Sequence, residues 1–221
     1  VENNPINLDM REAGAMVHVT FGINIVVDTS SRHSGLFCGE FDKAWQASCS
    51  YVQKGYGLPI DYQADVVIAS CGGFPKDLNF YQSTKTLFNA SRAVKEGGTL
   101  IMLAECPEGS GSKDFFDWIK PLSKGCLDEA LRASFTIGGY IFYAACESIR
   151  RSKTLLLSSM EPELVRDMGV RSFKDMKDLL AEVDFNGKDV YVIPYGGSVL
   201  PQTKEAYERI CREAEENGGA K

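Results

Sequence analysis

Hydrophobic residues gather in continuous runs along much of this 221-residue chain, without a regular alternation of apolar and polar positions. Runs of this kind cover residues 64–70, 99–106, 153–159 and 188–197 and are rich in Val, Ile and Leu. A continuous apolar run bounded by turn residues is typical of a strand that is buried on both faces of a sheet. These four segments are therefore predicted to be strands of one buried sheet.

Helical patterns fill the intervals between the predicted strands. Helices are expected over residues 78–95, from Lys113 onward, and over 140–151, 162–169, 172–183 and 201–217. The Glu-Gly-Gly sequence at 96–98 is expected to stop the first of them. Because strands and helices alternate, the pattern predicts an α/β, Rossmann-like fold with a mostly parallel sheet flanked by helices.

The start of the chain is organised differently. A short helical pattern follows Pro5, an Ile- and Val-rich strand is expected at 21–28, and residues 36–41 are suited to pair with it. Asp42 is placed to cap a further helix, which glycines and a proline end. A boundary is therefore predicted at 57–61, where the regular alternation of strands and helices begins.

Composition excludes several classes of protein. A net charge of −6 and a pI near 5.1 are unfavourable for nonspecific binding to nucleic acid. No apolar run approaches the roughly 20 residues that span a bilayer, so no membrane contact is expected. The chain contains only two histidines, His18 and His33, and no metal site is predicted within it.

The seven cysteines are scattered and odd in number, and none forms a CxxC pair. This distribution does not suit a disulfide framework, and it favours reduced, buried thiols. Since the N-terminal sequence also lacks a signal-peptide pattern, a cytoplasmic location is expected.

The loop after the first sheet strand carries more polar chemistry than a connection requires. Its sequence, SCGGFPKD at 70–77, places Gly72 and Gly73 at the carboxyl end of a strand and before a helix. Ligands of open α/β sheets bind at such ends, and helix N-terminal N–H groups attract anions. Gly72 and Gly73 are therefore predicted to let an anion approach the backbone closely.

Three polar residues follow on the next helix. Lys85 lies four residues after Tyr81 and three after Gln82, so on a helix it neighbours both. An ammonium, an amide and a phenol gathered there can hold a small carboxylate, which predicts a substrate site. The alternative is that Tyr81 simply packs while Gln82 and Lys85 form a solvated face, and spacing alone does not separate the two interpretations.

The other loops carry weaker signals. Gly109 and Gly111 resemble half of a dinucleotide-binding fingerprint, but Asp114 stands where the third glycine belongs. Glu105 and Glu108 are interpreted as loop carboxylates, and the YGGS sequence at 195–198 as a plain turn. Cys71 has no histidine predicted near it to act as a base, so it is interpreted as a structural thiol.

The segments ADVVIASCGGFPKDLNFYQSTKTL, AVKEGGTLIMLAEC and EGSGSKDFFDW resemble the C-terminal half of the nickel-dependent lactate racemase family. The most specific part is the combination of GGxPKD with YQxxK. The opening residues resemble the end of that family's N-terminal lobe. The resemblance implies a remnant of that lobe and an interlobe helix at 1–58, a substrate-binding lobe at 59–200, and a helix and tail at 201–221.

The resemblance also implies a chemistry. Family members hold a nickel-pincer nucleotide in a cleft, tethered by the N-terminal lobe, which also supplies the acid/base histidines. The C-terminal lobe supplies a tyrosine, a glutamine and a lysine to a 2-hydroxy acid substrate, and these correspond to Tyr81, Gln82 and Lys85. No catalytic residue and no bound cofactor are then expected within this chain, which would be inactive alone.

One position departs from the family pattern. Tyr140 and Ile141 follow the glycines of FTIGGYIFYAA, where a His-Lys pair is expected, and this suggests a different 2-hydroxy acid. Two functions remain open: one lobe of a racemase or epimerase, or a noncatalytic module that binds a small carboxylate or a nucleotide. A dinucleotide-dependent oxidoreductase is the least favoured alternative. The partners expected are the substrate, the missing N-terminal lobe and, in a homo-oligomer, a second copy of the chain.

Overall fold

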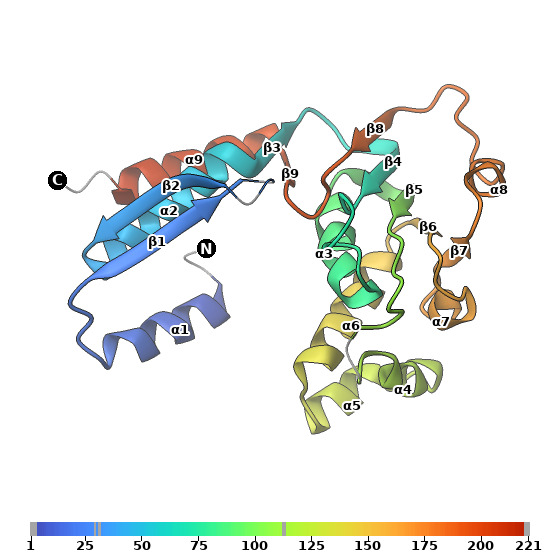
Figure 1. Ribbon diagram of the computed structural model, residues 1–221, viewed down its shortest axis with the longest axis horizontal. Coiled ribbons are helices and arrows are strands. Elements are labelled where there is room, and N and C mark those ends of the chain that lie inside the picture. Colours follow the sequence, from blue (N-terminus) through green and yellow to red (C-terminus); the bar gives the residue numbers. More distant parts are fainter. Residues whose placement is uncertain (1–3, 29, 31, 112–113, 219–221) are drawn as a thin grey trace. The chain divides into compact units, whose positions relative to one another are not determined.

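The fold is described from a computed structural model (Figure 1). The structure describes residues 4–28, 30, 32–111 and 114–218, without the side chains of 215–218. The chain divides into two compact units: one contains the residues up to Gly55 together with those from Glu208 onward, and the other contains Tyr56–Tyr207. None of the described helices is long and apolar enough to cross a membrane.

The first unit is a two-stranded antiparallel ribbon with helices. Its elements are α1 (Pro5–Ala15), β1 (Gly22–Val27), β2 (His33–Gly39), α2 (Phe41–Tyr56) and most of α9 (Lys204–Gly218). β1 and β2 pair with each other, which confirms the predicted pairing of these segments. In Figure 1, α2 and α9 run side by side along the ribbon.

The second unit contains the sheet. Its strands are β3 (Gly57–Ile60), β4 (Ala64–Ser70), β5 (Val94–Leu103), β6 (Lys153–Leu157), β7 (Arg171–Phe173), β8 (Val190–Ile193) and β9 (Leu200–Thr203). Its helices are α3 (Phe80–Ala90), a 3-10 turn η1 (Phe115–Trp118), α4 (Ile119–Ser123), α5 (Leu127–Ala133), α6 (Ile137–Ile149), α7 (Glu163–Arg166) and α8 (Met176–Leu180).

Five strands form one sheet in the order β7-β6-β5-β4-β8, and every pair in it is parallel. The predicted α/β fold with a mostly parallel sheet flanked by helices is therefore confirmed. Because β8 returns to the outer side of β4, the strand order reverses at β4. The loops that follow β4 and β8 consequently leave the same edge of the sheet next to each other.

Helices cover both faces of this sheet, which explains the continuous apolar runs. On one face, Leu87 of α3 and Phe142 of α6 are buried in a cluster with Leu100 of β5. On the other face, Leu179 of α8 is buried with Val66 of β4. Each buried apolar side chain of this kind stabilises the fold by roughly 1.5–3 kcal/mol.

Several element boundaries differ from the predictions. α3 ends at Ala90, five residues before the predicted end, because Val94 already pairs with Ala64 at the start of β5. The Glu-Gly-Gly sequence at 96–98 therefore lies within β5 and does not stop a helix. The predicted helix start at Lys113 lies outside the described residues, and the helical turn that the structure describes there is η1.

Three short parallel strands were not predicted. β7 occupies the start of the helix predicted over 172–183, because Ser172 and Phe173 pair with β6, and the helix there, α8, begins only at Met176. β3 pairs with β9, and Pro201, which the sequence placed near the start of the last helix, lies in β9. The predicted cap of α2 was also wrong. The carboxylate of Glu40, in place of Asp42, accepts the N–H groups of Asp42 and Lys43 at 3.1 and 3.0 Å. The division of the protein at 1–58, 59–200 and 201–221 stays a prediction.

Candidate functional site

The candidate site begins where β4 ends at the carboxyl edge of the sheet. Gly72 and Gly73 have φ angles of +87° and +78°, in the left-handed region that favours glycine. Asn79 ends the loop, and its side chain accepts the N–H of Gln82 at 3.0 Å, which starts α3. The loop sequence thus turns the chain sharply out of β4 and into α3 with an asparagine N-cap.

The N–H groups at the start of α3 are not free to bind an anion. Phe80 and Tyr81 donate to the carbonyl oxygens of Gly109 and Ser110 at 2.8 and 3.1 Å. The N–H of Gln82 is taken by Asn79, and that of Gly72 by the Ser70 hydroxyl at 3.0 Å. The first N–H groups of α3 are therefore already bonded to a neighbouring loop and to the N-cap, and the predicted approach of an anion at Gly72 and Gly73 stays a prediction.

Side chains are the polar groups that remain available. Lys85 Nζ donates to Gln82 Oε1 over 2.8 Å, so the structure brings these two predicted residues together. Lys85 is exposed, while Gln82 is partly buried. The Tyr81 ring packs edge-on against Phe115, with ring centroids 5.8 Å apart. The site therefore consists of an amide–ammonium pair beside a phenol that is anchored to the core.

The loop at 105–111 organises the start of α3. Its Gly109 and Ser110 carbonyl oxygens accept the first N–H groups of α3. It also carries Glu108, whose Oε2 accepts a hydrogen bond from Asn79 Nδ2 over 3.2 Å. Gly111 has a φ of +82°, and a Cβ atom built on it would lie 2.1 Å from Asn79 Cγ. Gly111 thus allows close packing against the cap of α3, and Glu108 is a loop carboxylate with a structural contact.

Replacing Gly111 by alanine is expected to destabilise the second unit because the new methyl group collides with Asn79. Gly109→Ala is the matched control: Gly109 also has a positive φ, +64°, but nothing lies within 4 Å of its built Cβ. Backbone strain costs about 1–2 kcal/mol in both variants. Overpacking adds about 1–3 kcal/mol in Gly111→Ala alone. Urea unfolding of the two variants measures the difference, and equal midpoints would contradict this assignment.

The YGGS loop is more than the plain turn that the sequence suggested. Lys76 Nζ donates to Ser198 Oγ over 2.6 Å, and the N–H of Gly196 donates to the Ser70 carbonyl over 2.8 Å. A Cβ on Gly72 would lie 2.9 Å from the Tyr195 ring. Sequence reasoning missed Ser198 and Tyr195, although their position after a parallel strand is the signal that could have found them.

An open cavity of about 440 Å³ lies beside this junction. Its lining includes Ser70, Gly72 and Tyr195 together with apolar side chains of the strands. Tyr81, Gln82 and Lys85 are not part of the lining. The carboxyl edge of the sheet therefore offers the exposed Gln82–Lys85 pair and, separately, an apolar hollow.

The cysteine at the end of β4 has the properties of a packing residue. Cys71 is fully buried, and burial raises the pKa of its thiol despite hydrogen bonds with Thr86 and Ser83. Burial also raises the pKa of the neighbouring Cys106 to about 11. Both thiols stay protonated near neutral pH, so neither is poised to act as a nucleophile.

The residues that depart from the family pattern lie on α6. Tyr140, in its first turn, is 43% exposed, while Ile141 packs against the core. The glycine before them, Gly139, lies against Trp118, because a Cβ there would come within 2.3 Å of the indole ring. Within the described residues, no group of three or more His, Cys, Asp or Glu side chains is arranged to hold a metal ion.

Fold and site together define a class: an open α/β domain with a candidate ligand site at the carboxyl ends of its strands. Residues 60–200 match the family "Lactate racemase C-terminal domain". Because this match covers more than half of the chain, the chain belongs to that family.

Relatives of known sequence agree with this assignment. The chain is 32% identical over 218 residues to a lactate racemase of Thermoanaerobacterium thermosaccharolyticum, and this covers 92% of the chain and 50% of that enzyme. It is 33% identical over 131 residues to a lactate racemase of Lactiplantibacillus plantarum, covering 58% of the chain and 31% of that enzyme. The chain thus spans half the length, or less, of the enzymes that it matches.

Solved structures show the same relationship. The lactate racemase apoprotein from Thermoanaerobacterium thermosaccharolyticum superposes with a TM-score of 0.81 at 30% identity, over 91% of this chain and 50% of that one. A protein from Thermotoga maritima matches with a TM-score of 0.58 at 14% identity, covering 83% of this chain and 49% of that one. The second likeness shows the fold alone.

Proposed function

We propose that this chain is the substrate-binding part of a racemase or epimerase of 2-hydroxy acids, in a protein about twice as long. The observation that carries the proposal is the Lys85–Gln82 pair at the start of α3, in a chain of the lactate racemase family. Whole-protein activity requires residues outside this chain, and the chain alone is proposed to be inactive.

In this proposal the positive charge of Lys85 binds the substrate carboxylate. Lys85 has three donors and uses one on Gln82 Oε1, which leaves two for the ligand. The same contact orients the Gln82 amide, so that its NH₂ group is available as a second donor beside the ammonium. Two adjacent donors fix the plane of a carboxylate better than a lone charge does.

Tyr81 has an orienting role in the proposal. Its ring is fixed edge-on against Phe115, which is fully buried. A phenol on a fixed ring can direct its hydroxyl group towards the substrate without a large loss of side-chain entropy. Gly72 and Gly73, with their positive φ angles, are proposed to let the ligand approach the loop after β4.

The proposal includes a nickel-pincer nucleotide held by the other half of the protein. The described residues of this chain do not fit the role of a nickel site, since they contain no metal-ligating group of side chains. Hydride exchange at C2 of the substrate is the chemistry that this cofactor supplies when bound. The part proposed for this chain is limited to binding and orienting the 2-hydroxy acid.

The proposal also places the protein in the cytoplasm. All seven cysteines are free thiols in the structure, and three of them are buried: Cys71, Cys106 and Cys146. Free thiols are typical of a reducing compartment.

Nickel analysis and a racemase assay test the proposal together. The racemase-length polypeptide that carries these 221 residues is coexpressed with cofactor-synthesis proteins, and a panel of 2-hydroxy acids is followed by chiral chromatography. Stoichiometric nickel and racemisation of at least one acid are expected. A nickel-free, inactive protein that still binds a small carboxylate would favour the alternative, a noncatalytic binding module.

A further inference from the structure

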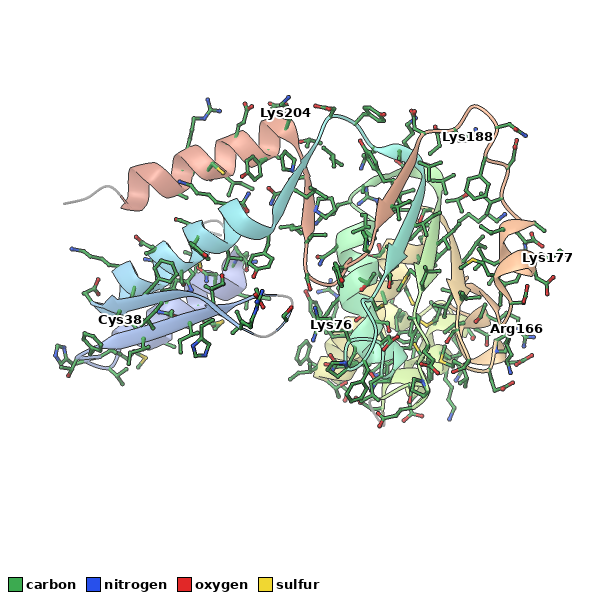
Figure 2. All side chains as sticks on the ribbon, turned by 45° about the horizontal axis from the view of Figure 1, so that its top comes forward. Cys38, Lys76, Arg166, Lys177, Lys188 and Lys204 are labelled. Atoms are coloured by element: carbon green, nitrogen blue, oxygen red, sulfur yellow. The ribbon has the colours of Figure 1, made fainter. Side chains whose placement is uncertain are left out.

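The lysine of the GGxPKD sequence has no role in the function proposed above, yet the structure gives it a specific contact. Lys76 lies in the loop between β4 and α3, and Figure 2 labels it. Its ammonium donates to Ser198 Oγ over 2.6 Å, across 122 positions of the sequence. Within the described part of the chain, no carboxylate forms an ion pair with Lys76. The hydrogen bond to Ser198 is therefore the polar contact that fixes this partly buried side chain.

Ser198 belongs to the YGGS loop, residues 195–198, which is hydrogen-bonded at two further points. The N–H of Gly196 donates to the Ser70 carbonyl, at the end of β4, over 2.8 Å. The Gly196 carbonyl accepts a hydrogen bond from Asn89 Nδ2, on α3, over 2.9 Å. The YGGS loop thus connects the end of β4, the loop that follows it, and the helix α3.

The YGGS loop contacts the side of α3 that carries the Gln82–Lys85 pair. Residues 85, 86 and 89 follow Gln82 by three, four and seven positions, so on a helix all of them share one face. Asn89 of this face bonds the loop, and a Cβ atom built on Gly196 would lie 2.6 Å from Thr86 Cγ2. Because the loop backbone packs so closely against this face, it restricts rotation and sliding of the helix.

The start of α3 is held from a different direction. Phe80 and Tyr81 donate their N–H groups to carbonyl oxygens of the loop at 105–111. Contacts at one end of a helix leave it free to pivot about that end. The contacts of the YGGS loop with Thr86 and Asn89, further along α3, complete the orientation of the helix.

We propose that the YGGS loop orients α3 for substrate binding, and that Lys76 is a positioning residue that acts through Lys85. Lys76 holds the loop against the helix by way of Ser198, and the loop holds the Lys85 ammonium and the Gln82 amide where both can bond one carboxylate. The inference rests on the proposed function, because it requires that the Gln82–Lys85 pair binds the substrate.

A double-mutant cycle in the cofactor-loaded, racemase-length protein tests the inference. Lys76→Met removes the ammonium and keeps an unbranched side chain. It is expected to raise KM about fivefold and to leave kcat within about twofold, because a displaced pair binds the substrate and the transition state less tightly to the same extent. In a Lys85→Ala background, the same substitution is expected to change kcat/KM by less than about twofold. Lys177→Met, on α8, is the matched control and should change neither constant.

Two further variants disrupt the same connection without replacing Lys76. Ser198→Ala removes the acceptor of the Lys76 ammonium, and Asn89→Ala removes the hydrogen bond between α3 and the loop. Each is expected to raise KM to a similar extent. Ser198→Ala combined with Lys76→Met should have no larger effect than either substitution alone, since both break one contact. Urea unfolding checks that every variant keeps its fold.

Binding distinguishes a failure of this inference from a failure of the proposed function. Isothermal titration calorimetry with lactate gives dissociation constants that need no turnover. Weaker binding by Lys76→Met that disappears in the Lys85→Ala background supports the inference, and if no 2-hydroxy acid is racemised, the proposed function alone fails. Unchanged KM and lactate affinity in Lys76→Met, or an equal loss with and without Lys85, would overturn the inference and leave the proposed function in place. Neither binding nor turnover by the wild-type protein would overturn both.

Discussion

Replacing Lys85 by alanine in the racemase-length protein is expected to lower kcat/KM about 30-fold or more without unfolding the protein. The loss follows because Lys85 is proposed to pair with the substrate carboxylate. Removing one partner of a desolvated charge pair costs about 2–5 kcal/mol. Each 1.4 kcal/mol corresponds to about a tenfold change in rate. Because Lys85 is exposed in this chain, the free energy of unfolding should change by no more than about 0.5 kcal/mol.

Lys177→Ala is the matched control for this experiment. Lys177 is likewise exposed and helical, on α8, and Figure 2 labels it there. Chiral chromatography gives the rates, and urea unfolding checks the fold of both variants. Wild-type turnover of Lys85→Ala would exclude Lys85 from substrate binding. A loss of similar size in Lys177→Ala would show that the effect is not specific to the site.

Replacing Phe115 by alanine is expected to have the largest effect on stability. Phe115 is fully buried and lies at the centre of an aromatic cluster, with ring centroids 6.1 Å from Phe80, 5.8 Å from Tyr81 and 5.2 Å from Phe142. Truncating a buried phenylalanine costs about 3–5 kcal/mol, because the transfer free energy is lost and a cavity remains. Urea unfolding of this chain measures the change.

Phe135→Ala is the control for Phe115→Ala. Phe135 also belongs to the second unit but is 67% exposed, and its ring contact is with Tyr140 at 6.3 Å. Its loss should cost about 1 kcal/mol or less. If the two variants unfolded at the same urea concentration, the aromatic cluster would not be the support of Tyr81 that the structure indicates.

Much of the sheet was predictable because its central strands are buried on both faces. Continuous apolar runs located β4 and β6 to within a few residues, since a parallel strand covered by helices on each side has no polar face. The short strands β3 and β9 were not predictable. Each has only four residues, and their pairing joins segments about 140 positions apart, which no local pattern reports.

The spacing of Gln82 and Lys85 was likewise sufficient to bring them together. Residues three apart on one helix meet whatever surrounds the helix, and the 2.8 Å hydrogen bond agrees with this expectation. The direction of the Tyr81 ring could not be deduced in this way, because it depends on Phe115, which lies 34 positions further along the chain.

The sequence by itself determined the α/β class, the sheet strands β4 and β6, and the helical spacing that joins Gln82 to Lys85. These depend on interactions within a few residues or on burial that a local pattern reveals. The tertiary structure decided how the start of α3 is used. Its N–H groups, free in any isolated helix, are bonded to the carbonyl oxygens of Gly109 and Ser110. Only the packed loop brings those acceptors to the helix, and it leaves the Lys85 and Gln82 side chains as the available donors.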